Sequence, residues 1–288
     1  MNNIPSKLSA LNRKDIFQQS TEEVRKRLKT FDQFAHKGTR GHAAIIAGSD
    51  GMMGASILAT SSCMRSGCGK TTAIIPRQYY SLIHATVPEA LVLDNNDKES
   101  DLNPFDAIAI GPGIGITNHS RIVLEKVFQA GKSMVIDADA LNIISQTENP
   151  FSQIPYNAIL TPHHKEWERL VSKTDNDYIK INTSLELCNK FNINILLKGH
   201  FSVFVTPSSF FINGTGNAGM GKAGSGDVLT GILASLLAQG YTPEDAGIIG
   251  MYIHGLAGDI AKDNLGEDYM TASDIIHYIS ASFISIRN

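Results

Sequence analysis

The feature of the sequence that most limits its fold is a repeated alternation between short apolar runs and longer segments of helical periodicity. Runs that are apolar at every position are typical of strands covered on both faces, as in parallel sheets. Their alternation with helices predicts a doubly wound α/β fold, in which a mostly parallel central sheet lies between two layers of helices. The predicted strands are 43–47, 71–76, 107–110, 133–136, 158–160, 193–197, 202–206 and 210–212.

The predicted helices complete this three-layer α/β/α arrangement. They are 53–66, 119–130, 165–171, 178–192, 227–239, 243–262 and 271–286. A local hairpin at the sheet edge is predicted where two strand-like runs meet across Pro207–Ser208–Ser209. Ser20–Thr21–Glu22–Glu23 fits a capping box that begins a short helix. Because no linker or repeat divides the chain, we expect a single domain over 1–288, with 1–30 as an N-terminal extension.

Charge and cysteine content exclude several classes of function. With 25 basic and 28 acidic residues, the chain has no basic excess that would attract nucleic acid or anionic lipid. Cys63, Cys68 and Cys188 are too few for a disulfide framework, which indicates a reducing compartment. The N-terminus lacks a secretory signal, and the apolar stretch 228–243 is interrupted by polar residues and glycines, which favours a buried helix over a membrane span. We therefore expect a cytoplasmic protein with small-molecule partners.

Small, polar and titratable residues directly follow several predicted strands. They include the glycine-rich segment Gly111–Gly115, the acids Asp137 and Asp139, His163 and Lys198. In an open parallel sheet, ligands bind at the carboxyl ends of the strands. Glycines at strand–helix turns are expected on structural grounds alone, whereas two acids, a histidine and a lysine are not. The sequence therefore predicts a functional site at this edge of the sheet.

The strongest local signal is the turn Gly224–Ser225–Gly226–Asp227, which directly precedes an apolar helix. Two glycines around a small hydroxyl residue let the backbone approach a ligand, and the helix N-terminus adds partial positive charge. This pattern favours an anion hole for a phosphoryl group. Asp227 then has two interpretations: a cap of the helix, or a general base that takes the proton of a substrate hydroxyl during phosphoryl transfer. The mobile, glycine-rich approach over 213–221 favours the base.

Lys198 and the histidines are less specific signals. Lys198 could contact nucleotide phosphates, or it could be a lysine at a strand end whose ammonium reaches solvent. The nine histidines are scattered, and only His163 and His164 are adjacent. Because adjacent residues of a helix or strand point in different directions, we predict no metal site built from histidines.

These residues resemble a known family. Gly224–Ser225–Gly226–Asp227 is similar to the G-x-G-D signature of the ribokinase-like superfamily. From about residue 30 to 262 the chain resembles one branch of it, the nucleotide-dependent NAD(P)H-hydrate dehydratases. The matching stretches, in family order, are His36–Gly38, Ile46–Ser49 with Gly54–Ala55, Ile110–Gly115, Asp137–Asn142, Thr161–His163 with Glu166, Leu197–Gly199, Asn213–Asn217 and His254–Asp259.

The resemblance implies repair of a damaged nicotinamide cofactor. Such enzymes phosphorylate the ring hydroxyl of hydrated NADH or NADPH, using ADP (ATP in some relatives) with Mg²⁺, and phosphate then leaves as the double bond is restored. It implies a ribokinase-like fold and a catalytic turn made of Gly224, Ser225, Gly226 and Asp227. The implied contacts to the hydrated dinucleotide are Ala55, Gly113 or Gly115, His163 and Asp227. The implied contacts to the adenine nucleotide are Lys198, Gly199, His200, Phe201, Ser202 and Gly226.

Three further acids are candidates for positions near Mg²⁺ by the same resemblance. They are Asp137, Asp139 and Glu166, although Asp139 could equally cap a helix beginning at Ala140. The sequence departs from the family at four positions. Ser225 stands for the usual Thr, Met53 for a common Tyr, His164 for a Pro and His200 for a small residue.

Other readings of the sequence stay open. A small-molecule kinase acting on a thiazole alcohol or a sugar would leave its product phosphorylated, and a catalytically silent nucleotide-binding protein would not turn over at all. The intact Asp227 in its intact turn argues against the silent protein. Because about thirty residues precede the matched region, we expect no fused epimerase domain, action on the S epimer only, a separate epimerase and, as relatives suggest, a homotetramer. The sequence does not decide between ADP and ATP, or between the hydrates of NADH and NADPH.

Overall fold

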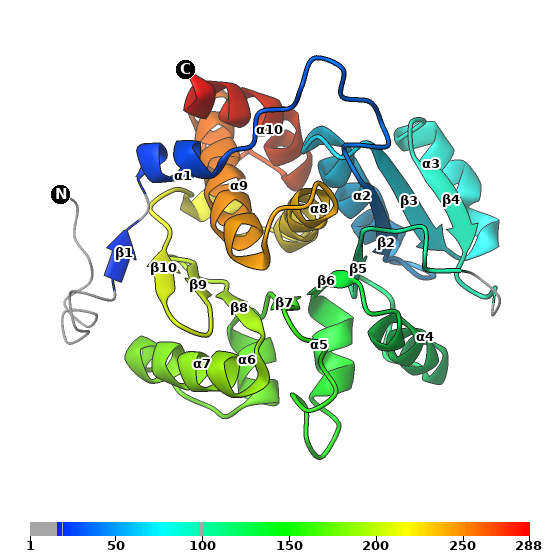
Figure 1. Ribbon diagram of the computed structural model, residues 1–288, viewed down its shortest axis with the longest axis horizontal. Helices are drawn as coiled ribbons and strands as arrows, with labels where there is room; N and C mark the ends of the chain where they lie inside the picture. The colour runs from blue at the N-terminus through cyan, green and yellow to red at the C-terminus, as the bar shows by residue number, and fades with distance from the viewer. Residues whose placement is uncertain (1–15, 19, 98–100) are drawn as a thin grey trace.

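The computed structural model describes residues 16–18, 20–97 and 101–288, and in these residues it confirms the predicted fold class. Ten strands form one sheet in the order β1-β10-β9-β8-β7-β6-β5-β2-β3-β4 (Figure 1). Only β9 runs antiparallel to its neighbours in the described sheet. The strands are β1 (Ile16–Gln18), β2 (His42–Ile46), β3 (Lys70–Ile75), β4 (Leu91–Asp94), β5 (Ala107–Ile110), β6 (Ser133–Ile136), β7 (Ile159–Leu160), β8 (Asn194–Leu197), β9 (Val203–Val205) and β10 (Phe210–Ile212).

All eight predicted strands are present, and so is the predicted hairpin, which joins β9 and β10. Two strands were not predicted. β1 has three residues and pairs in parallel with β10. β4 is the opposite edge strand, and its Leu91 and Leu93 are exposed, so it lacks the two-sided burial on which the strand prediction relied.

The helices also follow the predicted order, with α3 as an addition and α5 beginning at Ala138 rather than at the expected Ala140. They are α1 (Thr21–Arg27), α2 (Met53–Arg65), α3 (Tyr80–Thr86), α4 (Asn118–Gln129), α5 (Ala138–Ile144), α6 (His164–Leu170), α7 (Asp177–Phe191), α8 (Ser225–Ala238), α9 (Pro243–Leu265) and α10 (Ala272–Arg287), with short 3₁₀ turns at Arg77–Tyr79 and Ala218–Met220. The predicted capping box begins α1, because the Ser20 side chain accepts from the Glu23 amide while the Glu23 carboxylate accepts from the Ser20 amide.

Alternating side chains of the central strands pack into two hydrophobic cores, one on each face of the sheet. On β2, Ala43 and Ile45 pack with α8, α9 and α10, whereas Ala44 and Ile46 pack with α4, α5, α6 and α7 on the other face. Figure 1 shows these two helix layers on opposite sides of the sheet. Burial on both faces explains why the strands read as continuous apolar runs in the sequence.

The predicted buried helix is α8, in which twelve of fourteen residues are buried. In the described part of the chain, no helix combines the length and apolar character needed to cross a membrane. Cys63, Cys68 and Cys188 are buried free thiols.

The tight packing of α8 on α2 yields a first testable prediction. A Cβ added to Gly231 would lie 2.1 Å from both the Ala59 carbonyl oxygen and the Ser62 hydroxyl. Gly231→Ala should therefore force the helices apart and destabilise the protein by about 1–3 kcal/mol, the range for overpacked cores. Urea unfolding measures the change. Gly54→Ala is the matched control, because nothing lies within 4 Å of its added Cβ, and an equal loss in both variants would contradict the packing argument.

Candidate active site

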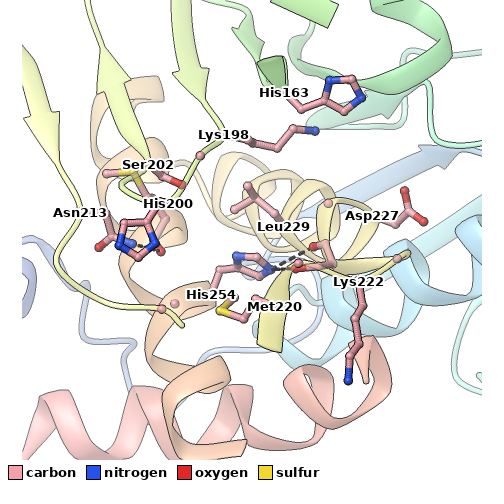
Figure 2. Close-up of a pocket in the computed structure, with 18 of the residues that line it drawn as sticks. His163, Lys198, His200, Ser202, Asn213, Met220, Lys222, Asp227, Leu229 and His254 are labelled. Atoms are coloured by element: carbon pink, nitrogen blue, oxygen red, sulfur yellow. Dashed lines mark hydrogen bonds between the residues drawn. The ribbon is translucent and has the colours of Figure 1, made fainter. Parts of the chain in front are cut away.

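A cavity of about 720 Å³ opens where β6, β7 and β8 end and α8 begins. Asp137, His163 and Lys198 reach it from the three strand ends, and the turn Gly224–Asp227 closes it from the opposite side. Figure 2 shows the labelled residues around it: His163, Lys198 and Asp227 on one side, and His200, Ser202 and Asn213 on the other. The residues on which the sequence prediction of a site rested thus lie around one cavity at the carboxyl edge of the sheet.

The turn before α8 presents free backbone amides to this cavity. Gly224 has a φ of +91° and lies against Leu58, whose Cδ1 atom would be 2.5 Å from an added Cβ, so the position requires glycine. The amides of Gly226 and Asp227 have no backbone acceptor in the described structure. Free amides at the start of a fourteen-residue helix form a site for an anion, because the helix dipole adds to their partial charge.

Asp227 is not the cap of this helix. Its carboxylate makes no hydrogen bond with the described residues, whereas Asp274, at the equivalent third position of α10, accepts a bond of 2.7 Å from the Thr271 amide. Burial, reinforced by the charge of Asp137, raises the pKa of Asp227 to about 6. A half-buried carboxylate that lines the cavity, has no partner and titrates near neutrality is suited to act as a general base.

Lys198 is held inside the protein by two carboxylates. Its Nζ atom lies 2.7 Å from Asp137 Oδ1 and 3.9 Å from Glu166 Oε2, and Thr230 donates to the other Asp137 oxygen at 2.8 Å. Burial alone would lower the pKa of Lys198, but the charges of Asp137 and Glu166 outweigh it and raise the pKa. Lys198 therefore stays protonated in the wall of the cavity. This excludes the interpretation in which its ammonium lies in solvent.

The lysine charge lies beside the glycine turn. A Cβ added to Gly226 would be 3.4 Å from Lys198 Nζ and 3.8 Å from Asp137 Oδ2. The ammonium group and the free amides thus approach the same part of the cavity. Together they form a binding place for a negatively charged group, next to the carboxylate of Asp227.

The residues expected to contact the dinucleotide divide into two neighbouring groups. His163 and Asp227 line the cavity, while Ala55, Gly113 and Gly115 are not part of its described lining. Gly113 lies against the start of α2, where an added Cβ would be 3.2 Å from Ala55 Cβ. Their binding roles stay predictions.

Asp139 links the loop of Gly113 and Gly115 to the cavity wall, and it does not have the capping role that the sequence suggested. Its Oδ2 atom accepts a hydrogen bond of 2.9 Å from the Gly115 amide. The interpretation of Asp139 as the cap of a helix starting at Ala140 is wrong, because α5 begins at Ala138 and Asp137 occupies the N-cap position. Asp139 instead fixes the loop after β5 to α5, whose first residue lines the cavity.

The residues expected to contact the nucleotide are mostly at the main cavity. Lys198, Gly199, His200, Ser202 and Gly226 line it. Phe201 does not: it is 39% exposed and lines an adjoining cavity of about 370 Å³, which shares His163, Lys198, Gly199 and His200 with the first. The nucleotide contacts of all six residues stay predictions.

The structure also adds residues to which the sequence analysis gave no role. His254 donates from Nε2 to the Ser225 carbonyl at 2.9 Å, and burial lowers its pKa to about 4, so it is a neutral support of the glycine turn. Asp259 accepts from the Gly216 amide at 2.8 Å and from Asn217 Nδ2 at 3.0 Å. These bonds hold the glycine-rich segment 213–221 in place, although its glycine content predicts a mobile segment. Both residues belong to one stretch of the family resemblance, which was their only signal.

The architecture and the position of this turn define a ribokinase-like α/β protein. The crystal structure of ADP/ATP-dependent NAD(P)H-hydrate dehydratase from Bacillus subtilis, co-crystallised with ATP and Mg²⁺, is similar to this chain with a TM-score of 0.86. The two chains are 29% identical, and the match covers 94% of this chain and 99% of that one.

Sequence comparison specifies the family. The family model of NAD(P)H-hydrate dehydratase matches residues 43–281, and the chain belongs to this family. It is 36% identical to the ADP-dependent (S)-NAD(P)H-hydrate dehydratase of Neisseria meningitidis, over 87% of this chain and 90% of that protein. It is 32% identical to the bifunctional NAD(P)H-hydrate repair enzyme of Thermofilum pendens over 88% of this chain, but spans only 51% of that longer protein.

Proposed function

We propose that this protein uses ADP to dehydrate the S epimer of hydrated NADH or NADPH and so restores the reduced cofactor. One observation carries the proposal: the unbonded carboxylate of Asp227 lies beside the free amide of Gly226 and the ammonium of Lys198. A base next to an anion site is what transfer of a phosphoryl group to an alcohol requires. The activity of the relative from Neisseria meningitidis supports the choice of substrate.

The proposed reaction has two steps. Asp227 takes the proton of the ring hydroxyl as its oxygen attacks the β-phosphorus of ADP, and AMP leaves. The carbon–oxygen bond then breaks, phosphate departs with the bonding electrons, and loss of a proton from the adjacent ring carbon restores the double bond. The Gly226 amide and Lys198 stabilise negative charge on the phosphoryl group, which is the principal task of a protein in such a transfer.

The wall of the cavity fits a divalent cation that arrives with the nucleotide. Asp137, Glu166 and Asp227 bring three carboxylates together against the ammonium of Lys198. Burial, together with the charge of Asp137, raises the pKa of Glu166 against the opposing charge of Lys198. Asp137 and Glu166 would hold Mg²⁺, which proteins bind through one or two carboxylates plus waters and phosphate oxygens. When bound, Mg²⁺ neutralises phosphate charge.

The deciding experiment is product analysis. Purified protein is incubated with the S epimer of hydrated NADH and with ADP or ATP in parallel. The proposal requires recovery of the reduced-nicotinamide absorbance with release of inorganic phosphate and, with ADP, of AMP. A stable phosphorylated product would instead establish a small-molecule kinase. Bound nucleotide without turnover of either kind would establish a silent binding protein.

The pH dependence of turnover follows from the base. The pKa of Asp227 is raised to about 6, and only the deprotonated carboxylate accepts the hydroxyl proton. We therefore expect kcat/KM to rise about tenfold per pH unit below pH 6 and to level off above it. Because imidazoles also titrate in this range, His163→Gln is the control. Its profile should keep the acid limb, and disappearance of that limb would assign the base to His163.

Three further expectations belong to this proposal. The bifunctional relative from Thermofilum suggests functional pairing of this activity with an epimerase. Homotetramer assembly and a cytoplasmic location also stay predictions. Analytical ultracentrifugation of the purified chain tests the assembly.

A further inference from the structure

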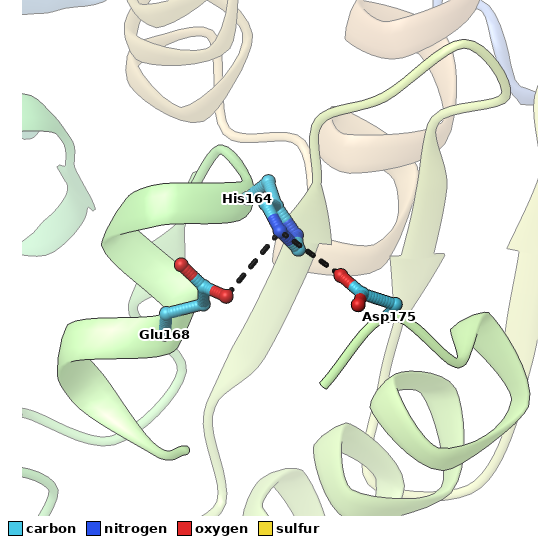
Figure 3. Close-up of side chains that lie close together, drawn as sticks. All are labelled: His164, Glu168 and Asp175. Carbon is cyan, nitrogen blue, oxygen red and sulfur yellow. Dashed lines mark ion pairs between the residues drawn. The ribbon is translucent and has the colours of Figure 1, made fainter. Parts of the chain in front are cut away.

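A cluster of three possible metal ligands lies outside the proposed active site. His164 and Glu168 are one turn apart on α6, and Asp175 follows in the segment before α7 (Figure 3). One ligand atom from each side chain lies within 4.8 Å of the other two. None of the three lines the main cavity. His164 does line the adjoining cavity of about 370 Å³, so the cluster lies beside the proposed active site rather than within it.

The spacing within this cluster does not correspond to hydrogen bonding. His164 Nε2 lies 3.4 Å from Glu168 Oε1 and 3.9 Å from Asp175 Oδ1. N–H···O bonds in proteins measure about 2.7–3.2 Å. A tetrahedral ion with ligand bonds of about 2.0–2.2 Å separates its ligand atoms by about 3.3–3.6 Å. The 3.4 Å separation matches this geometry, and a small movement of the exposed Asp175 side chain would bring the 3.9 Å separation to the same value.

We propose that His164, Glu168 and Asp175 bind a divalent transition metal ion of the zinc type, with water completing the coordination. One imidazole with two carboxylates is a donor set that zinc and cobalt accept readily, whereas Mg²⁺ prefers oxygen ligands alone in an octahedron. The two carboxylate charges match the charge of the ion. The site is distinct from the Mg²⁺ of the proposed reaction.

Lys180 competes with the metal for the imidazole. Its Nζ atom lies 2.8 Å from His164 Nδ1 and so donates to that nitrogen, which places the ring proton on Nε2. Metal binding at Nε2 requires the proton on Nδ1. Lys180 can then turn to Asp177, whose Oδ1 atom is already 3.6 Å from Nζ. The metal therefore replaces one hydrogen bond rather than leaving a buried charge unpaired.

The proposed ion would join α6 to the segment that leads into α7. The residues at the start of α6, His163 and Glu166, line the main cavity, and the His163 backbone and Glu166 carboxylate are bonded at 2.8 Å. An ion at His164 would thus restrain the helix that carries them. Because only the folded chain brings the ligands together, metal binding should raise the melting temperature.

Cobalt spectroscopy of the purified metal-free protein tests the site. Co²⁺ bound in a tetrahedral N/O environment should give a visible d–d absorption that saturates at one ion per chain, and Zn²⁺ should displace it. His164→Pro removes the imidazole and should still fold, because position 164 is the first residue of α6, where proline is tolerated, and His163 already has extended backbone angles. His119→Ala, at an exposed histidine of α4, is the matched control.

The outcomes separate clearly. We expect His164→Pro and Glu168→Gln to weaken binding at least about tenfold, since even outer contacts of a metal site change affinity about 10–100-fold, while His119→Ala binds as the wild type does. We expect Lys180→Met to bind about threefold more tightly, because methionine removes the competing bond to His164 Nδ1, a partly exposed contact worth under about 1 kcal/mol. No tetrahedral spectrum in the wild type, or an unchanged spectrum in His164→Pro, overturns the proposal, and weaker binding by Lys180→Met overturns the competition.

Discussion

Asp227→Asn is expected to lower turnover of the hydrated cofactor at least about a hundredfold while nucleotide affinity changes little. Asparagine keeps the shape of the side chain but cannot accept the hydroxyl proton, and general-base catalysis contributes about 10²–10⁴-fold. The amides and Lys198, which we expect to bind the nucleotide, are unaffected by the change. Single-turnover measurement of phosphate release, with calorimetry of ADP binding, separates the two effects.

Asp274→Asn is the matched control for this variant. Both aspartates are the third residue of a helix, but the Asp274 carboxylate caps α10 and the Asp227 carboxylate bonds to no described residue. The control should lose about 0.3–1 kcal/mol of stability, because asparagine keeps an acceptor oxygen but removes the negative charge at the helix N-terminus, and it should keep its turnover. Asp227→Asn should lose turnover and keep its stability. If Asp227→Asn lost stability and retained turnover, Asp227 would be a helix cap and the general-base assignment would be wrong.

This contrast shows why the sequence alone does not assign the role of Asp227. The spacing of the glycine turn predicted the position of Asp227 in the first turn of a helix, but a cap and a base have the same sequence pattern. Only the distances distinguish them. Lys198 is a similar case, because a strand-end lysine can reach solvent or pair inside the protein, and its partner Asp137 lies 61 residues earlier in the chain.

Elements that rest on tertiary contacts were the ones missed or misplaced. The eight predicted strands were recognisable because burial on both faces makes most of their residues apolar. β4 lacks that signal, since Leu91 and Leu93 are exposed at the sheet edge. The start of α5 was misplaced because Asp139, a good capping residue, bonds to the distant Gly115 amide instead. His254 has no local pattern at all, because its role depends on Ser225 of another helix.

Lys198→Met is expected to destabilise the protein by about 3–5 kcal/mol at neutral pH, the cost of leaving a buried charge without its partner. Asp137 is 1% exposed and Glu166 is 5% exposed, so neither carboxylate can regain full hydration when the ammonium is removed. The loss should shrink as the pH falls, because a protonated carboxyl needs no counter-ion. Urea unfolding at several pH values measures both effects. A loss below about 1 kcal/mol, the value of a surface ion pair, would contradict the buried geometry.

The double variant Asp137→Asn/Lys198→Met tests whether the stability lost in Lys198→Met comes from the unpaired carboxylate charge. Removing both charges should recover most of the lost stability, because a buried pair is worth little against a neutral replacement even though breaking it is costly.

The single variant Lys198→Met should also change the pH dependence of turnover. The charge of Lys198 lowers the pKa of Asp227 against burial and the charge of Asp137. Without it, the acid limb of the pH profile should move to higher pH. A limb that stays in place would mean that the lysine stabilises the fold without setting the strength of the base.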